Sequence, residues 1–156
     1  MTNRLEALED WTAWLLGQLE PPSRNKLVRS LGQTLRRSQQ QRIIAQQNPD
    51  GSKYAPRKER NLRGKQGRVK RKVKMFQKIR TAGFLKMHSD GNAIRIGFTG
   101  RVARIARVHQ FGLKDTAALG APDVMYDQRH ILGLSDADLE VIRDHLLTQL
   151  KGRLPT

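Results

Sequence analysis

The sequence predicts an α+β fold, with a helical pair at the N-terminus, a small central antiparallel hairpin and a helix at the C-terminus. Three observations predict it. Apolar residues recur at helical spacing near both ends, two alternating apolar runs flank an Asp-Gly turn, and helices and strands do not alternate along the chain. A length of 156 residues is typical of one domain, so we expect residues 1–156 to form a single domain.

Residues 1–47 are expected to form a helical hairpin. The apolar stripe of the first helix contains leucines and a tryptophan, and Thr2 or Asn3 can cap its start. Pro21 and Pro22 should end this helix, because proline lacks the amide hydrogen that a helix interior needs. Ser23 can then cap a second helix that reaches about residue 47.

Two tryptophans on the first helix have two interpretations. Trp11 and Trp14 are three residues apart, so both cannot lie at the centre of one narrow apolar stripe. They are either part of the packing between helices or an anchor at a subunit interface, where tryptophan is enriched.

The positive charge is concentrated in the middle of the chain. The net charge is +16, and residues 21–80 carry nineteen basic and two acidic residues, whereas residues 1–20 carry one base and four acids. Residues 48–74 have few apolar groups and cannot bury enough surface to offset their ordering entropy alone. We therefore expect a basic extended arm or loop there, called the basic arm below, ordered only against a partner.

Residues 75–151 are expected to form an α+β core. Val69, Val73, Phe76 and Ile79 share one helical face and favour a short helix at its start. Residues 84–88 and 93–98 alternate around an Asp-Gly turn, a strong hairpin signal. A short helix from about 102 should end near Gly112, residues 113–130 read as irregular, and Ser135-x-x-Asp138 resembles a capping box that starts the last helix.

Several classes of function are not supported. The chain has no cysteine, so it has no thiol nucleophile and no cysteine-ligated metal. No apolar run reaches the ~18 residues that span a bilayer, and the acidic first ten residues do not resemble a secretory signal. The four histidines lie in different elements without metal-ligand spacing. We expect a protein that is not an enzyme and has no cofactor, metal site or membrane partner.

The basic arm leaves two kinds of partner open, and a third alternative is a basic loop with no partner. A basic segment can neutralise nucleic-acid phosphates without sequence preference, or it can bind acidic protein surfaces. Stacking on single-stranded bases is poorly supported, because aromatic residues are scarce in this region, which contains only Tyr54 and Phe76. The candidate contact residues of the arm are Lys53, Arg57, Lys58, Arg60, Arg63, Lys65, Arg68, Lys70, Arg71, Lys72 and Lys74.

Several strings of the sequence resemble the phage virion morphogenesis, or tail completion, family of contractile-tailed phages. They are Asn48-Pro49-Asp50-Gly51-Ser52-Lys53-Tyr54-Ala55-Pro56-Arg57, the run 74–80, the run 97–112 that ends in Val-His-Gln-Phe-Gly, and the run 129–135. The resemblance holds in order from about residue 1 to 151. The motif positions that it marks as structural or interfacial are Pro49, Gly51, Tyr54, Pro56, Arg104, His109, Gln110, Gly112 and Gly133.

The resemblance implies a structural virion protein that completes the head-proximal end of the tail and allows head–tail joining. It implies a ring of identical subunits, hexameric because tails are six-fold, with tail terminator, tube or neck connector proteins as neighbours. The location would be the virion tail or neck, after assembly in the host cytoplasm. The basic arm would contact those neighbours or the passing DNA, and deletion of residues 57–72 should block joining. A small basic nucleic-acid-binding protein is the alternative, but it leaves the motifs at 54–56 and 108–112 unexplained.

Overall fold

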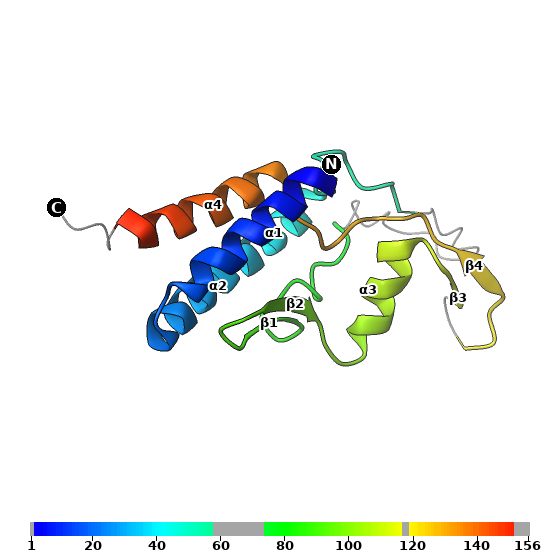
Figure 1. The fold of residues 1–156 in the computed structure, drawn as a ribbon. Coiled ribbons are helices and arrows are strands. Elements are labelled where there is room, and N and C mark those ends of the chain that lie inside the picture. Colours follow the sequence, from blue (N-terminus) through cyan, green and yellow to red (C-terminus); the bar gives the residue numbers. More distant parts are fainter. Residues whose placement is uncertain (1, 58–73, 117–118, 152–156) are drawn as a thin grey trace. The chain divides into compact units, whose positions relative to one another are not determined.

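The computed structural model describes residues 2–57, 74–116 and 119–151 (Figure 1). In this part of the chain the elements are, in order, α1 (Thr2–Gly17), α2 (Pro21–Ala45), β1 (Leu85–Ser89), β2 (Ile94–Phe98), α3 (Val102–Phe111), β3 (Lys114–Thr116), β4 (Asp123–Met125) and α4 (Asp136–Lys151). The predicted α+β class is thereby confirmed, with its N-terminal helices, central hairpin and C-terminal helix. None of these described helices is both long and apolar enough to cross a membrane.

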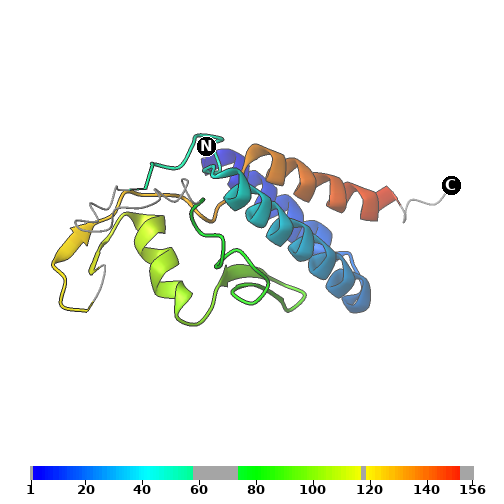
Figure 2. The ribbon, with the colours of Figure 1, turned by 180° about the vertical axis from the view of Figure 1, so that it is seen from behind.

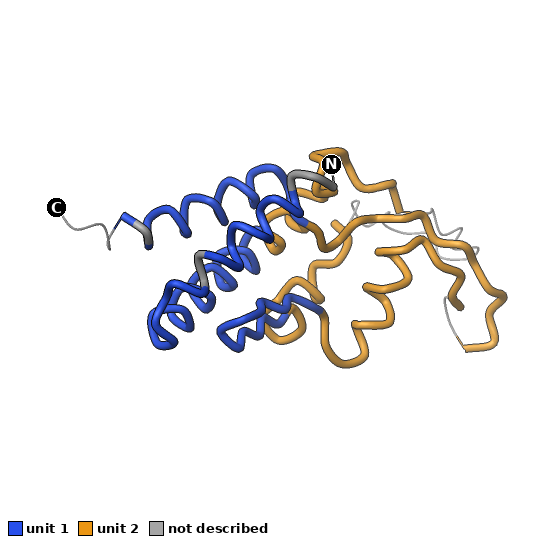
Figure 3. The backbone as a smooth tube through the Cα atoms, in the orientation of Figure 1, with its two compact units in different colours: residues 1–38, 86–97, 134–156 blue, residues 39–85, 98–133 orange. Residues whose placement is uncertain are grey.

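The backbone divides into two compact units (Figure 3). Unit 1 comprises residues 1–38, 86–97 and 134–156, and unit 2 comprises residues 39–85 and 98–133. Helix α2 runs through both units, and the hairpin of β1 and β2 belongs to unit 1 except for its two outer ends.

Unit 1 is built on three helices, α1, α2 and α4, which lie side by side in both views (Figures 1 and 2). Leu19, Leu27 and Leu146 form its buried core, with Trp11 and Ile142 packed against them. This arrangement follows from the apolar stripes, because each helix buries the face on which its leucines recur.

The β1–β2 hairpin packs on α2 at a position without a side chain. A Cβ atom at Gly32 would lie 2.8 Å from the Sδ atom of Met87 and 3.2 Å from Cγ2 of Ile94, so glycine permits this close approach. At the tip of the hairpin, the Asp90 carboxylate accepts hydrogen bonds from the amides of Asn92 and Ala93, at 3.1 and 2.9 Å. The short turn makes the two strands antiparallel, as predicted.

The capping box at the start of α4 is confirmed, with aspartate in the place usually taken by glutamate. The Ser135 Oγ accepts from the Asp138 amide at 3.2 Å, and the Asp138 carboxylate accepts from the Ser135 amide at 2.9 Å. Ser38 of α2 also donates its hydroxyl to this carboxylate, which is 2% exposed. One buried carboxylate therefore caps α4 and joins it to α2.

Unit 2 contains α3, the β3–β4 hairpin and the segments that surround them. Its core consists of Ile43, Ile79, Ala106 and Ile131, with Phe76, Phe98 and Val102 packed against it. Helix α3 ends at Gly112, as expected, with φ of 63° and ψ of 49° in the left-handed region that favours glycine. Strands β3 and β4 pair antiparallel, with Asp115 opposite Val124.

Three local predictions were wrong. Helix α2 begins at Pro21 rather than after Ser23, and the Arg24 amide donates to the Glu20 carbonyl at 2.9 Å. Proline is tolerated in a first helical turn because an amide hydrogen at that position would have no partner within the helix. The segment after Gly112 is not wholly irregular, because it contains β3 and β4.

The predicted short helix before the hairpin is also not formed in residues 74–80. These residues form turns, and Phe76 has a φ of 64°, which a right-handed helix excludes. Val69 and Val73, the first two members of that expected helical face, lie outside the described residues.

Candidate functional site

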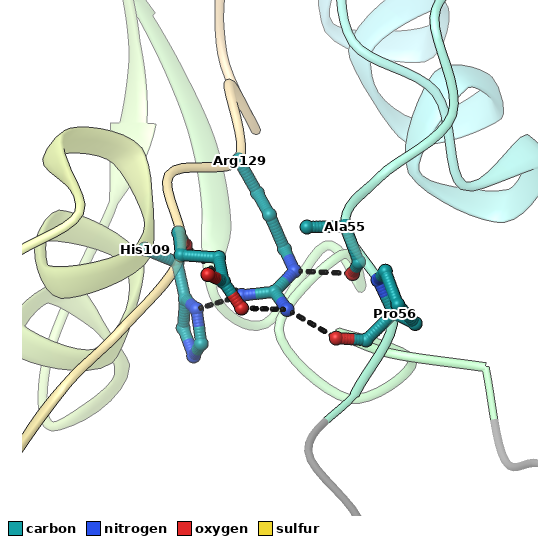
Figure 4. A network of polar contacts seen from close by, with 5 residues as sticks. Ala55, Pro56, His109 and Arg129 are labelled. Atoms are coloured by element: carbon teal, nitrogen blue, oxygen red, sulfur yellow. Dashed lines mark hydrogen bonds and ion pairs between the residues drawn. The ribbon is translucent and has the colours of Figure 1, made fainter.

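A buried arginine holds together three distant segments of unit 2 (Figure 4). The Arg129 guanidinium donates to the Ala55 carbonyl at 2.8 Å, the Pro56 carbonyl at 2.8 Å and the Asp127 carbonyl at 3.0 Å. It also donates to the Nδ1 atom of His109 at 3.1 Å, and its side chain is 3% exposed. Only the planar fork of an arginine offers donors in enough directions to bind four acceptors at once.

The partners of His109 define its protonation state. An arginine can only donate, so Nδ1 of His109 must be the acceptor and the ring proton must lie on Nε2. Burial, and then the charge of Arg129, lower the pKa of His109 to about 4, although Asp127 acts in the opposite direction. The ring is packed edge-to-face between Phe76 and Tyr126, with centroid distances of 4.9 and 5.0 Å. His109 is therefore a neutral structural residue at pH 7.

The two ends of the basic arm are anchored to the same place. On the N-terminal side, Tyr54 is buried and its ring meets that of Phe76 edge-to-face at 5.8 Å. On the C-terminal side, the Gln46 amide group donates to the Met75 carbonyl at 2.9 Å and accepts from the Met75 amide at 2.8 Å. Residues 57 and 74 thus leave from one anchored base.

Two residues of this base, Gln46 and Phe76, have an unusual backbone conformation. Gln46 and Phe76 have φ values of 59° and 64°, which are uncommon for residues other than glycine. Such conformations cost on the order of 1 kcal/mol or more each and persist where the surroundings impose them. Here the amide clamp on Met75 and the ring contacts of Phe76 impose them.

The motif positions of the predicted list gather around the same base. The Gln110 side chain donates to the Leu132 carbonyl and accepts from the Leu132 amide, each at 3.0 Å. A Cβ atom at Gly133 would lie 2.7 Å from the Cγ atom of Pro49, so two motif residues are in direct contact. Gly51, with φ of 83°, donates to the Asn48 carbonyl at 3.0 Å in the turn that precedes Tyr54.

A groove of about 830 Å³ lies beside the anchored base. We call it the unit 2 groove. Its basic lining residues include Arg57 and Lys74, the two residues of the basic arm that adjoin residues 58–73, and Arg104, which forms an ion pair with Asp115. Exposed apolar residues of the lining include Ile105 and Leu119. The arrangement offers a basic and apolar surface of a size suited to binding, within the roughly 300–1,000 Å³ of ligand-sized clefts.

The structure brings part of the predicted list together. Tyr54, Pro56, His109, Gln110, Gly112, Gly133, Arg57, Lys74 and Arg104 all belong to the base or to its groove. Lys53 takes part in an isolated bridge with Gln47. Trp11 packs into the unit 1 core, whereas Trp14 is 60% exposed. Lys58, Arg60, Arg63, Lys65, Arg68, Lys70, Arg71 and Lys72 lie outside the described residues.

Sequence reasoning missed the residues that hold the base together. Arg129 was one of many arginines, and Gln46 lay at the expected end of a helix, where nothing marks an amide as a clamp. The signal that could have singled out Arg129 is its place in the run 129–135, directly before the capping box. Among the described residues, no group of three or more histidine or acidic side chains could hold a metal ion.

Most polar groups of this site bind the protein's own main chain, so they hold the fold of unit 2 together. Comparison with known proteins identifies the family of the chain. The chain belongs to the phage virion morphogenesis family, whose model matches residues 3–151. It is 37% identical over 150 residues, 96% of this chain and 99% of the relative, to tail completion protein S of Escherichia phage P2. No solved structure matches the chain.

Proposed function

We propose that this chain is a structural component of the phage tail and neck that completes the head-proximal end of the tail and enables head–tail joining. The observation that carries the proposal is the end-to-end similarity to a tail completion protein, which covers 96% of this chain. The convergence of the motif residues on one anchored base supports it, because a rigid base is what an assembly element requires. In this proposal the protein is not an enzyme.

The proposal includes a ring of identical subunits, assembled in the host cytoplasm and retained in the virion. Identical subunits in a closed ring make heterologous contacts, in which two different surfaces of the chain meet. Six copies would match the hexameric symmetry of tails. The adjoining proteins would be the tail terminator or tube on one side and the neck connector on the other.

The basic arm is the proposed contact with these neighbours. Arg129 holds the arm near residue 55 and Gln46 holds it at Met75, so both sides of the arm are fixed to unit 2. The net charge of +16 favours an acidic protein surface or the DNA that passes through the neck.

The arm is tested by two replacements of residues 58–72, a stretch that leaves both anchors and Arg57 in place. In one, a glycine-serine linker of equal length replaces the stretch. In the other, its eight basic residues alone become glutamine. Both should leave the circular dichroism spectrum and thermal unfolding of the core nearly unchanged and should block head–tail joining in a complementation assay with a null phage.

The matched control exchanges Lys26 and Arg29, two exposed bases of α2, for glutamine. This control should join normally. Normal joining by both arm replacements would reject the proposed role of the arm.

The strongly basic composition favours one other candidate function, sequence-independent nucleic-acid binding. That reading requires an affinity for DNA that falls steeply with salt, because each neutralised phosphate releases counterions. Tight, salt-sensitive DNA binding by a monomer that purified virions lack would favour it over the structural role.

A further inference from the structure

The unit 2 groove carries charge that its own residues do not neutralise. Its acidic residues Asp115 and Asp127 are already paired with Arg104 and Arg129. Arg57 and Lys74 form no ion pair with any described residue. The lining of the groove also exposes two apolar side chains, Ile105 at 47% and Leu119 at full exposure. An exposed apolar surface with a charged rim is typical of an interaction site.

Helix α1 has the complementary surface. Glu6, Asp10 and Trp14 are spaced by four residues and therefore lie on one helix face, which we call the acidic stripe. All three are exposed, and Trp14 is 60% exposed because its neighbour Trp11 is the one that packs into the unit 1 core. Neither carboxylate of the stripe forms an ion pair with a described residue.

We propose that the acidic stripe of one copy of this chain docks into the unit 2 groove of the next copy, with Trp14 against Ile105 and Leu119 and with Glu6 and Asp10 opposite Arg57 and Lys74. The occupant is argued from charge complementarity, since two unpaired acids and an exposed tryptophan meet two unpaired bases and exposed aliphatic residues. The two surfaces differ, so the contact is heterologous and can repeat around a ring. The inference rests on the proposed ring and names the surfaces that close it.

The absence of cysteine in the chain allows a direct test. The variant W14C/I105C is oxidised in assembled tails and in purified protein, and the products are separated without reductant. A head-to-tail contact should yield a ladder of disulfide-linked species up to the full ring. W14C or I105C alone should yield no ladder, and an equal mixture of the two should stop at dimers. The matched control is W14C/N92C, because Asn92 is also exposed but lies at the hairpin turn of unit 1.

The same samples are treated with an amine-reactive cross-linker, which reports assembly without depending on either cysteine. Amine cross-links without the disulfide ladder would place the ring interface elsewhere and overturn this inference, while leaving the proposed function intact. The absence of both ladders in assembled tails would overturn the ring itself. A disulfide within one chain, seen as a faster-migrating monomer, would also overturn the inference.

Charge reversal provides an independent test. E6K/D10K and R57E/K74E should each raise the midpoint concentration of assembly at least tenfold, because like charges then face each other. The combined variant E6K/D10K/R57E/K74E restores opposite charges at every contact and should return assembly to within about threefold of the original chain. The control E140K/D144K reverses two exposed acids at the same spacing on α4 and should have little effect. Failure of the combined variant to restore assembly, with its helical content unchanged, would contradict the proposed contact.

Discussion

At the residue scale, Arg129 is the side chain on which the base of the basic arm depends most. It binds the carbonyls of Ala55, Pro56 and Asp127 and the ring of His109, in surroundings that leave it 3% exposed. Removal of such a buried donor leaves several acceptors without partners, and each unsatisfied buried group costs about 1–3 kcal/mol. Burial also lowers the pKa of Arg129, with Asp127 acting in the opposite direction, but arginine remains charged in proteins.

We therefore expect Arg129→Met to lower the free energy of unfolding by ~3 kcal/mol or more, measured by urea denaturation. Arg129→Lys should recover less than half of that loss, because an ammonium group cannot reach acceptors in four directions. A loss below 1 kcal/mol for Arg129→Met would show that the network is dispensable.

His109 gives the stability of the chain a pH dependence of known sign. Its pKa is about 4 in the folded state and about 6.5 in the unfolded state, so only the unfolded state takes up a proton between these values. The full stability is present above pH 6.5 and declines as the pH falls toward 4. Between pH 6.5 and 5 the loss from this residue should be about 1 kcal/mol, after an allowance for solvent screening.

The test compares the chain with His109→Gln, which keeps an acceptor for Arg129 but does not titrate. Unfolding by urea at several pH values should give a shallower decline for the variant between pH 6.5 and 5. Parallel curves for the two proteins would contradict the assignment of a neutral His109.

Single residues could be predicted from the sequence where the backbone conformation strongly favours one residue type. Gly112 ends α3 because helices commonly end at a left-handed residue, a conformation that glycine adopts without strain. The roles of Arg129 and Gln46 could not be predicted, because Arg129 binds the Ala55 carbonyl and Gln46 binds the Met75 main chain, both more than twenty residues away in the sequence.

At the scale of elements, the contribution of the α4 capping box to stability can be measured by itself. Ser135→Ala removes the hydroxyl that accepts from the Asp138 amide and should cost about 1 kcal/mol. The control is Ser23→Ala, at the position where the sequence favoured a cap but where α2 has already begun. It should change the free energy of unfolding by less than 0.5 kcal/mol. A larger loss for Ser23→Ala than for Ser135→Ala, in thermal or urea unfolding, would contradict this assignment of the caps.

The helices and the β1–β2 hairpin were predictable, and the three-residue strands were not. Helices α2 and α4 carry apolar stripes over four turns or more, and the Asp-Gly turn between β1 and β2 has few alternatives. Strands β3 and β4 have three residues each, too few for an alternating pattern to show. The turn at Phe76 overrides a helical spacing because Tyr54 and His109 bind its ring from two sides.

At the scale of the whole molecule, the proposed function makes this chain a permanent structural part of the phage particle. The similarity to a tail completion protein over nearly its full length, the pinned base of the basic arm and the complementary surfaces on α1 and in the unit 2 groove all support assembly as the purpose of the fold. Under the proposed function, the positive charge of the middle segment would serve contacts that form only in the assembled tail.

The copy number of the chain in purified virions tests this structural role. Quantitative mass spectrometry, with the tail tube protein as the internal standard, should find a fixed number of copies per particle, and a six-fold ring predicts six. Tails purified without heads should contain the same number. Virions that infect normally but contain none of this chain would contradict the account.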